Sequence, residues 1–280
     1  MINNNFLSFE RFALLLKKDF MENWKTMFLR FVMLYAILAI IFGFIGHWEY
    51  RLLNNNPSYF SHDNMNYITP AIFLFWGVGC LFASLMMEKM RSKTKRISYL
   101  MTPATSFEKY FSRLLIVVVV FIASYLVAFK LADYTRIAIF SICYPQLNIS
   151  SIDLLNLVDT KGYGGLAHTW GQFIGGFSIY LFFQSLFILG SILWYKNPFI
   201  KTIASGVVIV LIFTLIDGVL IHYLFPNDLK NLFSVSNYCE DIVNRWCTWR
   251  NTTILFSIFT LFNWTIAYFR FKDSEIINRI

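Results

Sequence analysis

Long apolar runs separated by polar and charged connections dominate the pattern of the chain. Six runs come close to the ~20 residues that a helix needs to cross ~30 Å of hydrocarbon. They lie at 27–46, 68–87, 114–132, 172–194, 202–224 and 252–269. The pattern predicts an all-α integral membrane protein with six transmembrane helices, organised as one domain over residues 1–280.

The segment before the first run, residues 8–25, has a helical period. Its apolar positions fall on one arc, and they are Phe9, Phe12, Ala13, Leu16, Phe20 and Trp24. The charged residues Arg11, Lys18, Glu22 and Lys25 fall on the opposite arc. This pattern predicts an amphipathic helix lying in the membrane interface. The alternative interpretation is a solvated start of the first span.

Composition and charge fit a membrane protein. The chain is 57% hydrophobic and 14% charged, whereas a soluble domain is usually near a quarter charged. Of the 24 Lys and Arg residues, 17 lie in the segments on the same side as the N-terminus. Basic residues concentrate on the cytoplasmic side, so both termini are predicted to be cytoplasmic. The net charge of +8 then reflects topology, and nucleic-acid binding is not expected.

Few features of the spans themselves suggest function. Arg30 and Lys130 lie near span ends, which leaves Asp217 as the acid expected at depth. Such a residue has either a structural role, bonded to a neighbouring helix or to water, or a place in a transport path. Gly171 and Gly175, followed by Gly176, match a GxxxG pattern that favours close helix packing.

Two of the predicted outer connections are long, and they cover residues 133–171 and 225–251. Apolar stretches at 137–144, 152–158, 229–232 and 242–246 predict short helices lying on or within the membrane surface. Cys239 and Cys247 fall in the second connection. They form a disulfide if their compartment is oxidising, or remain two free thiols.

The known signatures of catalysis are missing from the sequence. There is no GxSxG, no HExxH and no GxxxxGK[ST] phosphate loop, and the four histidines stand alone. The sequence therefore predicts no catalytic residue, no metal site and no cofactor bound by this chain, and we do not expect it to be an enzyme.

The cytoplasmic connection from 88 to 113 is the most informative stretch. A basic extension of the second span is predicted to run to Arg96, and Pro103 prevents a continuous helix. Thr105 and Glu108 have the spacing of a capping box that starts a new helix. The connection is either a positive loop facing anionic lipid or a docking surface for a cytoplasmic partner.

Part of this stretch resembles the segment before the third span of type-2 ATP-binding-cassette (ABC) transporter permeases. The resemblance lies in residues 99–109, YLMTPATSFEK, which are followed by YFSRLL. Residues 10–19 resemble the elbow helix of that family, and residues 267–272 resemble its common ending. The connection between the third and fourth spans is long, and in this respect the chain differs from the best-known members of the family.

The resemblance implies a coupling loop and an elbow helix. The coupling residues would be Arg96, Pro103, Thr105, Glu108, Lys109 and Arg113, and the elbow residues would be Phe12, Leu16, Phe20 and Trp24. Residues 225–251 would correspond to re-entrant outer helices. The implied partners are a cytoplasmic ABC ATPase subunit that binds the ATP, a second permease in a homodimer or heterodimer, and membrane lipids.

The expected function is the permease subunit of an ABC-type transporter, an exporter in the bacterial cytoplasmic (inner) membrane. Its substrate is not named by the sequence, because fold alone does not choose one. The alternative is a non-transporting scaffold or sensor subunit. A third reading, an enzyme acting on lipid-linked substrates, would use Asp217, His222, Asp228, Glu240 and Asp241.

Overall fold

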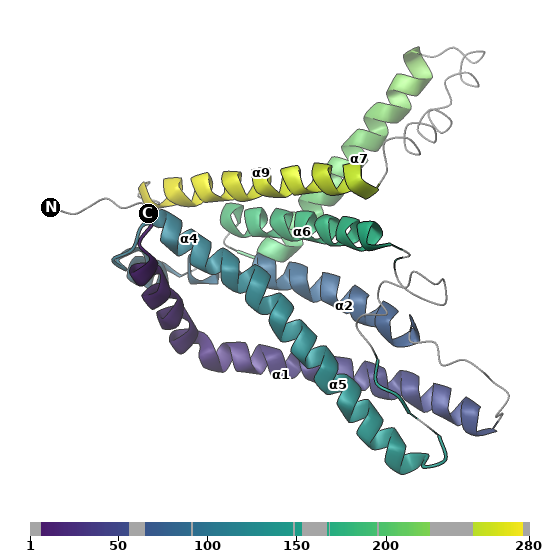
Figure 1. Ribbon diagram of the computed structural model, residues 1–280. Helices are drawn as coiled ribbons and strands as arrows, with labels where there is room; N and C mark the ends of the chain where they lie inside the picture. Colours follow the sequence, from purple (N-terminus) through teal and green to yellow (C-terminus); the bar gives the residue numbers. More distant parts are fainter. Residues whose placement is uncertain are drawn as a thin grey trace. The chain divides into compact units, whose positions relative to one another are not determined.

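Every element in the described part of the chain is a helix (Figure 1). The computed structural model describes residues 7–55, 65–90, 92–147, 149–152, 167, 169–194, 196–224 and 249–276. The elements are α1 (Phe9–Asn55), α2 (Met65–Ser84), η1 (Glu88–Met90), α3 (Lys93–Leu100), α4 (Ser106–Leu115), η2 (Ile116–Val120), α5 (Phe121–Cys143), α6 (Trp170–Leu193), α7 (Pro198–Leu224) and α9 (Trp249–Ile276).

Six helical stretches are long and apolar enough to cross a membrane. They are Phe9–Leu53, Met65–Ser84, Ser106–Cys143, Trp170–Leu193, Pro198–Ile216 and Trp249–Ser274. Each overlaps one of the six apolar runs, which confirms the prediction of an all-helical chain with six membrane-spanning candidates. The chain therefore has the architecture of a multi-pass membrane protein.

The amphipathic segment and the first span form one helix rather than two. α1 is 47 residues long and contains no proline, so nothing in its sequence forces a break. In Figure 1 its first part, drawn in the darkest purple, runs at an angle to the rest. The helix predicted over 8–25 is present, and its position in a membrane interface stays a prediction.

Two predicted boundaries are wrong. The second span does not extend as a basic helix to Arg96, because α2 ends at Ser84 and is followed by a turn, η1 and a separate helix α3. The connection that was expected from Asp133 onward does not begin there, because α5 continues to Cys143. Most of the stretch 137–144, expected as a separate short helix, is therefore the end of α5.

Other expectations fall on residues that the structure does not describe. The stretches 229–232 and 242–246 lie outside the described residues, as does 152–158 except for Ile152. Cys239 and Cys247 are also outside them.

The chain divides into two compact units. Unit 1 comprises Met1–Phe82 and Met101–Phe173, and unit 2 comprises Ala83–Leu100 and Ile174–Ile280. In unit 1, α1 packs along α5. Phe42 of α1 is buried there, with its ring edge-on to Phe129 at 5.3 Å and to Tyr67 of α2 at 5.6 Å.

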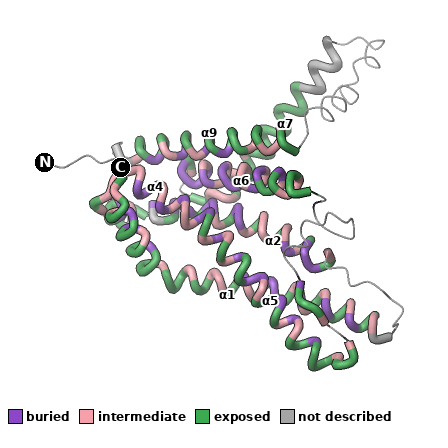
Figure 2. The backbone as a smooth tube through the Cα atoms, viewed as in Figure 1, coloured by how far each residue is buried: buried purple, intermediate pink, exposed green. Residues whose placement is uncertain are grey.

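In unit 2, α6 packs against α9. Phe182 contacts Phe256, with ring centroids 5.2 Å apart, and the Asn263 side-chain amide donates to the Ser185 hydroxyl at 2.9 Å. Gly175 of the GxxxG pattern lies against the Trp249 ring, so this glycine serves packing within the chain, whereas a methyl group at Gly176 would meet nothing within 4 Å. By contrast, residues 206–216 of α7 are exposed throughout (Figure 2).

Candidate functional site

The start of α4 is fixed by the capping box that its sequence predicts. The Thr105 hydroxyl accepts from the Glu108 backbone N–H at 3.2 Å, and the Thr105 N–H donates to Glu108 Oε2 at 2.9 Å. Thr105 has the extended backbone conformation of an N-cap, and Pro103 lies in the turn before it. Two otherwise unpaired N–H groups are satisfied, which fixes where α4 begins.

Glu108 also binds the start of α1. Its Oε1 atom accepts from the Ser8 backbone N–H at 2.8 Å and from the Arg11 guanidinium at 3.1 Å. The Glu108 carboxylate is 0% exposed, whereas the Arg11 side chain is 37% exposed, so the bonds are shielded from water on the carboxylate side alone. A buried carboxylate needs such donors to remain favourable, and here they come from two segments about a hundred residues apart in sequence.

A second polar contact joins the same two helices further along. The Arg113 guanidinium donates to Asp19 Oδ1 at 2.9 Å, and both side chains are largely buried. Between the two polar contacts the rings of Phe12 and Phe111 pack at 5.6 Å. We call this arrangement, formed by Ser8, Arg11, Phe12, Asp19, Thr105, Glu108, Phe111 and Arg113, the α1–α4 joint.

The six predicted coupling residues belong to different parts of the fold. Thr105, Glu108 and Arg113 belong to the α1–α4 joint, whereas Arg96 lies on α3 in unit 2. Lys109 is only 4% exposed. The side chains of Glu108 and Lys109 therefore do not form an open docking surface, and any coupling role for Glu108 would act through the joint.

The four predicted elbow residues differ in burial. Phe12 is buried against α4 and Leu16 is partly buried, while Phe20 and Trp24 are exposed. The face of α1 that meets α4 follows Phe12 and Asp19 instead of the complete apolar arc. Sequence reasoning missed Asp19, because a single acid on a helix gives no sign of its partner until the fold brings Arg113 to it.

A second buried polar cluster, also missed, lies at the other end of unit 1. Arg136 Nη2 donates to Asp133 Oδ1 at 2.7 Å, and these side chains are 2% and 0% exposed. Arg136 also donates to the Tyr50 hydroxyl at 2.6 Å and to the Ser150 carbonyl at 2.8 Å, while the Ile152 N–H donates to Asp133 Oδ2 at 2.8 Å. The pair holds residues 150–152 against α1 and α5.

The i,i+3 spacing of an acid and a base on one helix is the signal that could have found this pair. Lys130 extends the same cluster, because its ammonium group donates to the Ile152 carbonyl at 2.6 Å. It is therefore held by the 150–152 segment, in addition to lying near the predicted end of its span.

Two further expectations concern Asp217, the acid predicted at depth, and metal binding. Asp217 lies within α7, but its side chain is outside the described part of the structure. Over the residues that the structure describes, no group of three His, Cys, Asp or Glu side chains could hold a metal ion.

The fold and its apolar helices define the class, a multi-pass α-helical membrane protein. Beyond that class, no family model, no curated protein and no solved structure gives a significant match to the chain.

Proposed function

We propose that this chain is the membrane-spanning permease subunit of an ABC-type transporter, an exporter energised by a separate cytoplasmic ATPase. The observation that carries the proposal is the α1–α4 joint. The segment that resembles the family's coupling region contains Thr105 and Glu108, and these residues cap α4 while Glu108 binds the start of α1. Six apolar helices give the bundle that such a subunit needs.

The first part of α1 supports an elbow role in the membrane interface. Phe9, Phe20 and Trp24 follow one arc of the helix and are exposed, although each is strongly apolar, and Lys18 and Lys25 are exposed on the opposite arc. A helix with this surface gains by laying its apolar side chains in the bilayer and its lysines among the headgroups. The elbow would then lie on the cytoplasmic side, with both termini in the cytoplasm.

The mechanism follows from the hydrogen bonds of the joint. In this proposal the ATPase binds ATP and closes, pressing on the turn before α4. Because Glu108 bonds to the backbone of Thr105 and of Ser8, a displacement of α4 carries the start of α1 with it. Binding energy in the partner would thus bias a two-state bundle between its inward and outward arrangements. A paired permease would complete the path.

Purification from the native membrane in mild detergent tests the proposal. We expect a phosphate-loop ATPase to co-purify with the chain and to hydrolyse ATP. Met101, in the turn before α4, is 79% exposed, so Met101→Asp should release the ATPase without changing the fold. Ile142→Asp, at the exposed far end of α5, is the matched control and should retain it. Recovery of the chain without any ATPase would contradict the proposal.

A further inference from the structure

A π-helix interrupts the long helical stretch that contains α4. The stretch Ser106–Cys143 is continuous, and α4 passes through η2 (Ile116–Val120) directly into α5 (Figure 1). Every residue of η2 is isoleucine or valine, and β-branched residues form α-helix less readily than leucine or alanine because they lose χ1 freedom. A π turn holds one residue more than an α turn, since each N–H bonds to the carbonyl five residues back. η2 therefore acts as a one-residue insertion in an otherwise α-helical stretch.

The backbone hydrogen bonds change pattern at both ends of η2. At its start, the Ile116 N–H donates to the carbonyls of both Ser112 and Arg113. At its end, the Phe121 N–H donates to the Val118 carbonyl, three residues back. Sharp kinks in helices occur at π-bulges, among a few other features, because the regular ladder of bonds is broken there. The stretch contains no proline and no glycine, so η2 is the place where bending costs least.

On one side of η2, the α1–α4 joint holds α4 to the start of α1. Glu108 accepts from the Ser8 N–H at 2.8 Å, and Arg113 donates to Asp19 at 2.9 Å. At 1.5 Å per residue, these two contacts are about 16 Å apart along α1. Because the contacts act at two separate places, α4 cannot pivot on the start of α1. The two segments therefore move together, as one body.

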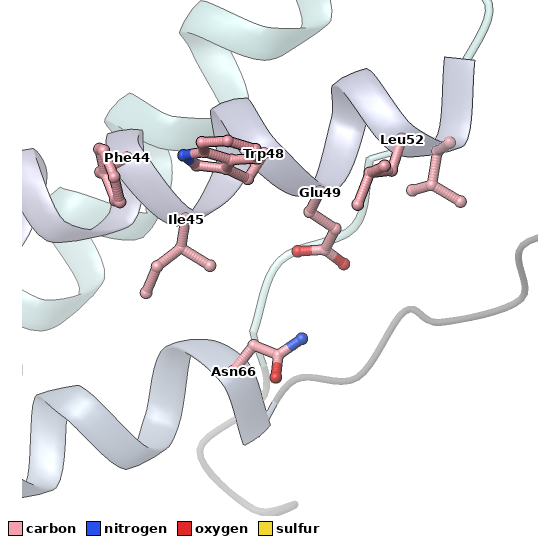
Figure 3. Close-up of a pocket in the computed structure, with 7 residues that line it drawn as sticks. Phe44, Ile45, Trp48, Glu49, Leu52 and Asn66 are labelled. Atoms are coloured by element: carbon pink, nitrogen blue, oxygen red, sulfur yellow. The ribbon is translucent and has the colours of Figure 1, made fainter. Parts of the chain in front are cut away.

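On the other side of η2, α5 is held to the second half of α1. The rings of Phe42 and Phe129 are 5.3 Å apart, and Arg136 donates to the Tyr50 hydroxyl at 2.6 Å. A pocket of about 410 Å³ lies here between α1 and Asn66 at the start of α2 (Figure 3), so α5 supplies most of the packing of α1. The second half of α1 and α5 therefore form a second body.

Between these two sets of contacts, the two helices differ in length. From Asp19 to Phe42, α1 covers about 34 Å, whereas from Arg113 to Phe129 the neighbouring stretch covers about 24 Å. The two helices therefore do not run parallel through this interval, and Figure 1 shows the first part of α1 at an angle to the rest. η2 lies within the same interval. The π-helix thus stands where the chain passes from the first body to the second.

We propose that η2 is a hinge, about which α4 and the start of α1 move as one body against α5 and the second half of α1. The change of hydrogen-bond pattern lets the backbone bend at η2, and the contacts on either side keep each body together. The hinge is a property of this chain and needs neither ATP nor a partner. Its use as the axis of an ATPase-driven displacement rests on the proposed function.

Distances between pairs of spin labels, measured by pulsed electron paramagnetic resonance, test the hinge in the purified full chain. With the four native cysteines replaced, Met101→Cys, before α4, is paired with Phe73→Cys on α2. α2 serves as the reference because the Tyr125 hydroxyl of α5 donates to its Ala71 carbonyl. The control pair joins Phe73→Cys to Ile139→Cys on α5. We expect the first distance distribution to be about twice as wide as that of the control. Equal widths in the wild-type background would overturn the inference.

A pair of single-residue deletions tests the role of the extra residue in η2. Deleting Val119, which is 53% exposed, should turn η2 into a regular α turn and keep both sets of contacts with α1. We expect this variant to fold, and its Met101–Phe73 distribution to narrow to the width of the control. Deleting Val127, which is 54% exposed in regular α5, rotates the rest of that helix by about 100° and breaks the contact of Arg136 with α1.

The melting temperature should therefore fall by about 10 °C for the Val127 deletion and by much less for the Val119 deletion. A Val119 deletion that folds and keeps the wide distribution would overturn the inference. Equal losses of melting temperature in the two deletions would overturn it as well. Because no step uses ATP or an ATPase, failure here is distinct from failure of the transport proposal.

Discussion

The buried charges of unit 1 are supplied with partners from several segments. Glu108 binds donors from the backbone of α1 and of its own cap, and Asp133 binds both Arg136 and the Ile152 N–H. A buried charge of this kind costs several kcal/mol when a partner is lost, because it cannot recover its hydration. Each is therefore a point where one substitution has a large effect.

Asp133→Ala tests this at the residue scale. It leaves the Arg136 guanidinium buried without its carboxylate, so we expect the free energy of unfolding to fall by about 3–5 kcal/mol. Chemical unfolding of the purified protein in detergent, followed by circular dichroism, measures the change. Glu22→Ala removes the exposed pair with Lys18 and should cost less than about 1 kcal/mol. Similar losses for the two variants would contradict the assignment.

At the scale of elements, one close helix approach depends on a glycine. Gly190 of α6 lies against Thr202 of α7, on the two arms of the tight hairpin whose connection includes Lys196 and Asn197. A methyl group at Gly190 would overlap the Thr202 hydroxyl and lie 3.1 Å from its Cβ atom, which is too short for a carbon–carbon contact. Thr202 cannot move away easily, since its hydroxyl donates to the Pro198 carbonyl.

Gly190→Ala should therefore destabilise unit 2 by about 1–3 kcal/mol, the usual cost of overpacking. Gly206→Ala is the matched control on α7, because a methyl group there meets nothing within 4 Å. Alanine is a better helix former than glycine, so the control should be neutral or slightly stabilising. Thermal unfolding of the two variants, measured side by side in one detergent, separates the effects. Equal melting temperatures would mean that the α6–α7 contact opens without cost.

At the scale of the whole molecule, the sequence predicts the apolar centres of the helices better than their ends. Hydropathy marks where a helix crosses lipid, but a helix stops only at a breaker or a cap. Hence α1 runs from Phe9 to Asn55 around the predicted span 27–46, and α5 continues past Asp133. The start of α4, which the Thr105 capping box marks by local chemistry, agrees with its prediction.

In the candidate site too, the contacts set by a local motif could be predicted and the contacts between distant segments could not. Thr105 and Glu108 could be paired from sequence, because a capping box is a local motif with fixed spacing. The partners Ser8 and Asp19 could not, since they lie about a hundred residues earlier and are recruited by packing. Asp133 and Arg136 were missed because they follow the apolar run of the third span, where charged residues are usually solvated. The structure shows instead that the two side chains form a buried ion pair.

Topology is the whole-molecule property on which the transport proposal depends, and it can be tested with two exposed positions. Cys143, at the end of α5, is predicted to face outward, and Met101, before α4, is predicted to face the cytoplasm. With Cys143 as the sole cysteine, a membrane-impermeant maleimide should label intact cells. With Met101→Cys as the sole cysteine, labelling should require permeabilised cells. The reverse pattern would place the α1–α4 joint on the outer side, where no cytoplasmic ATPase could reach it.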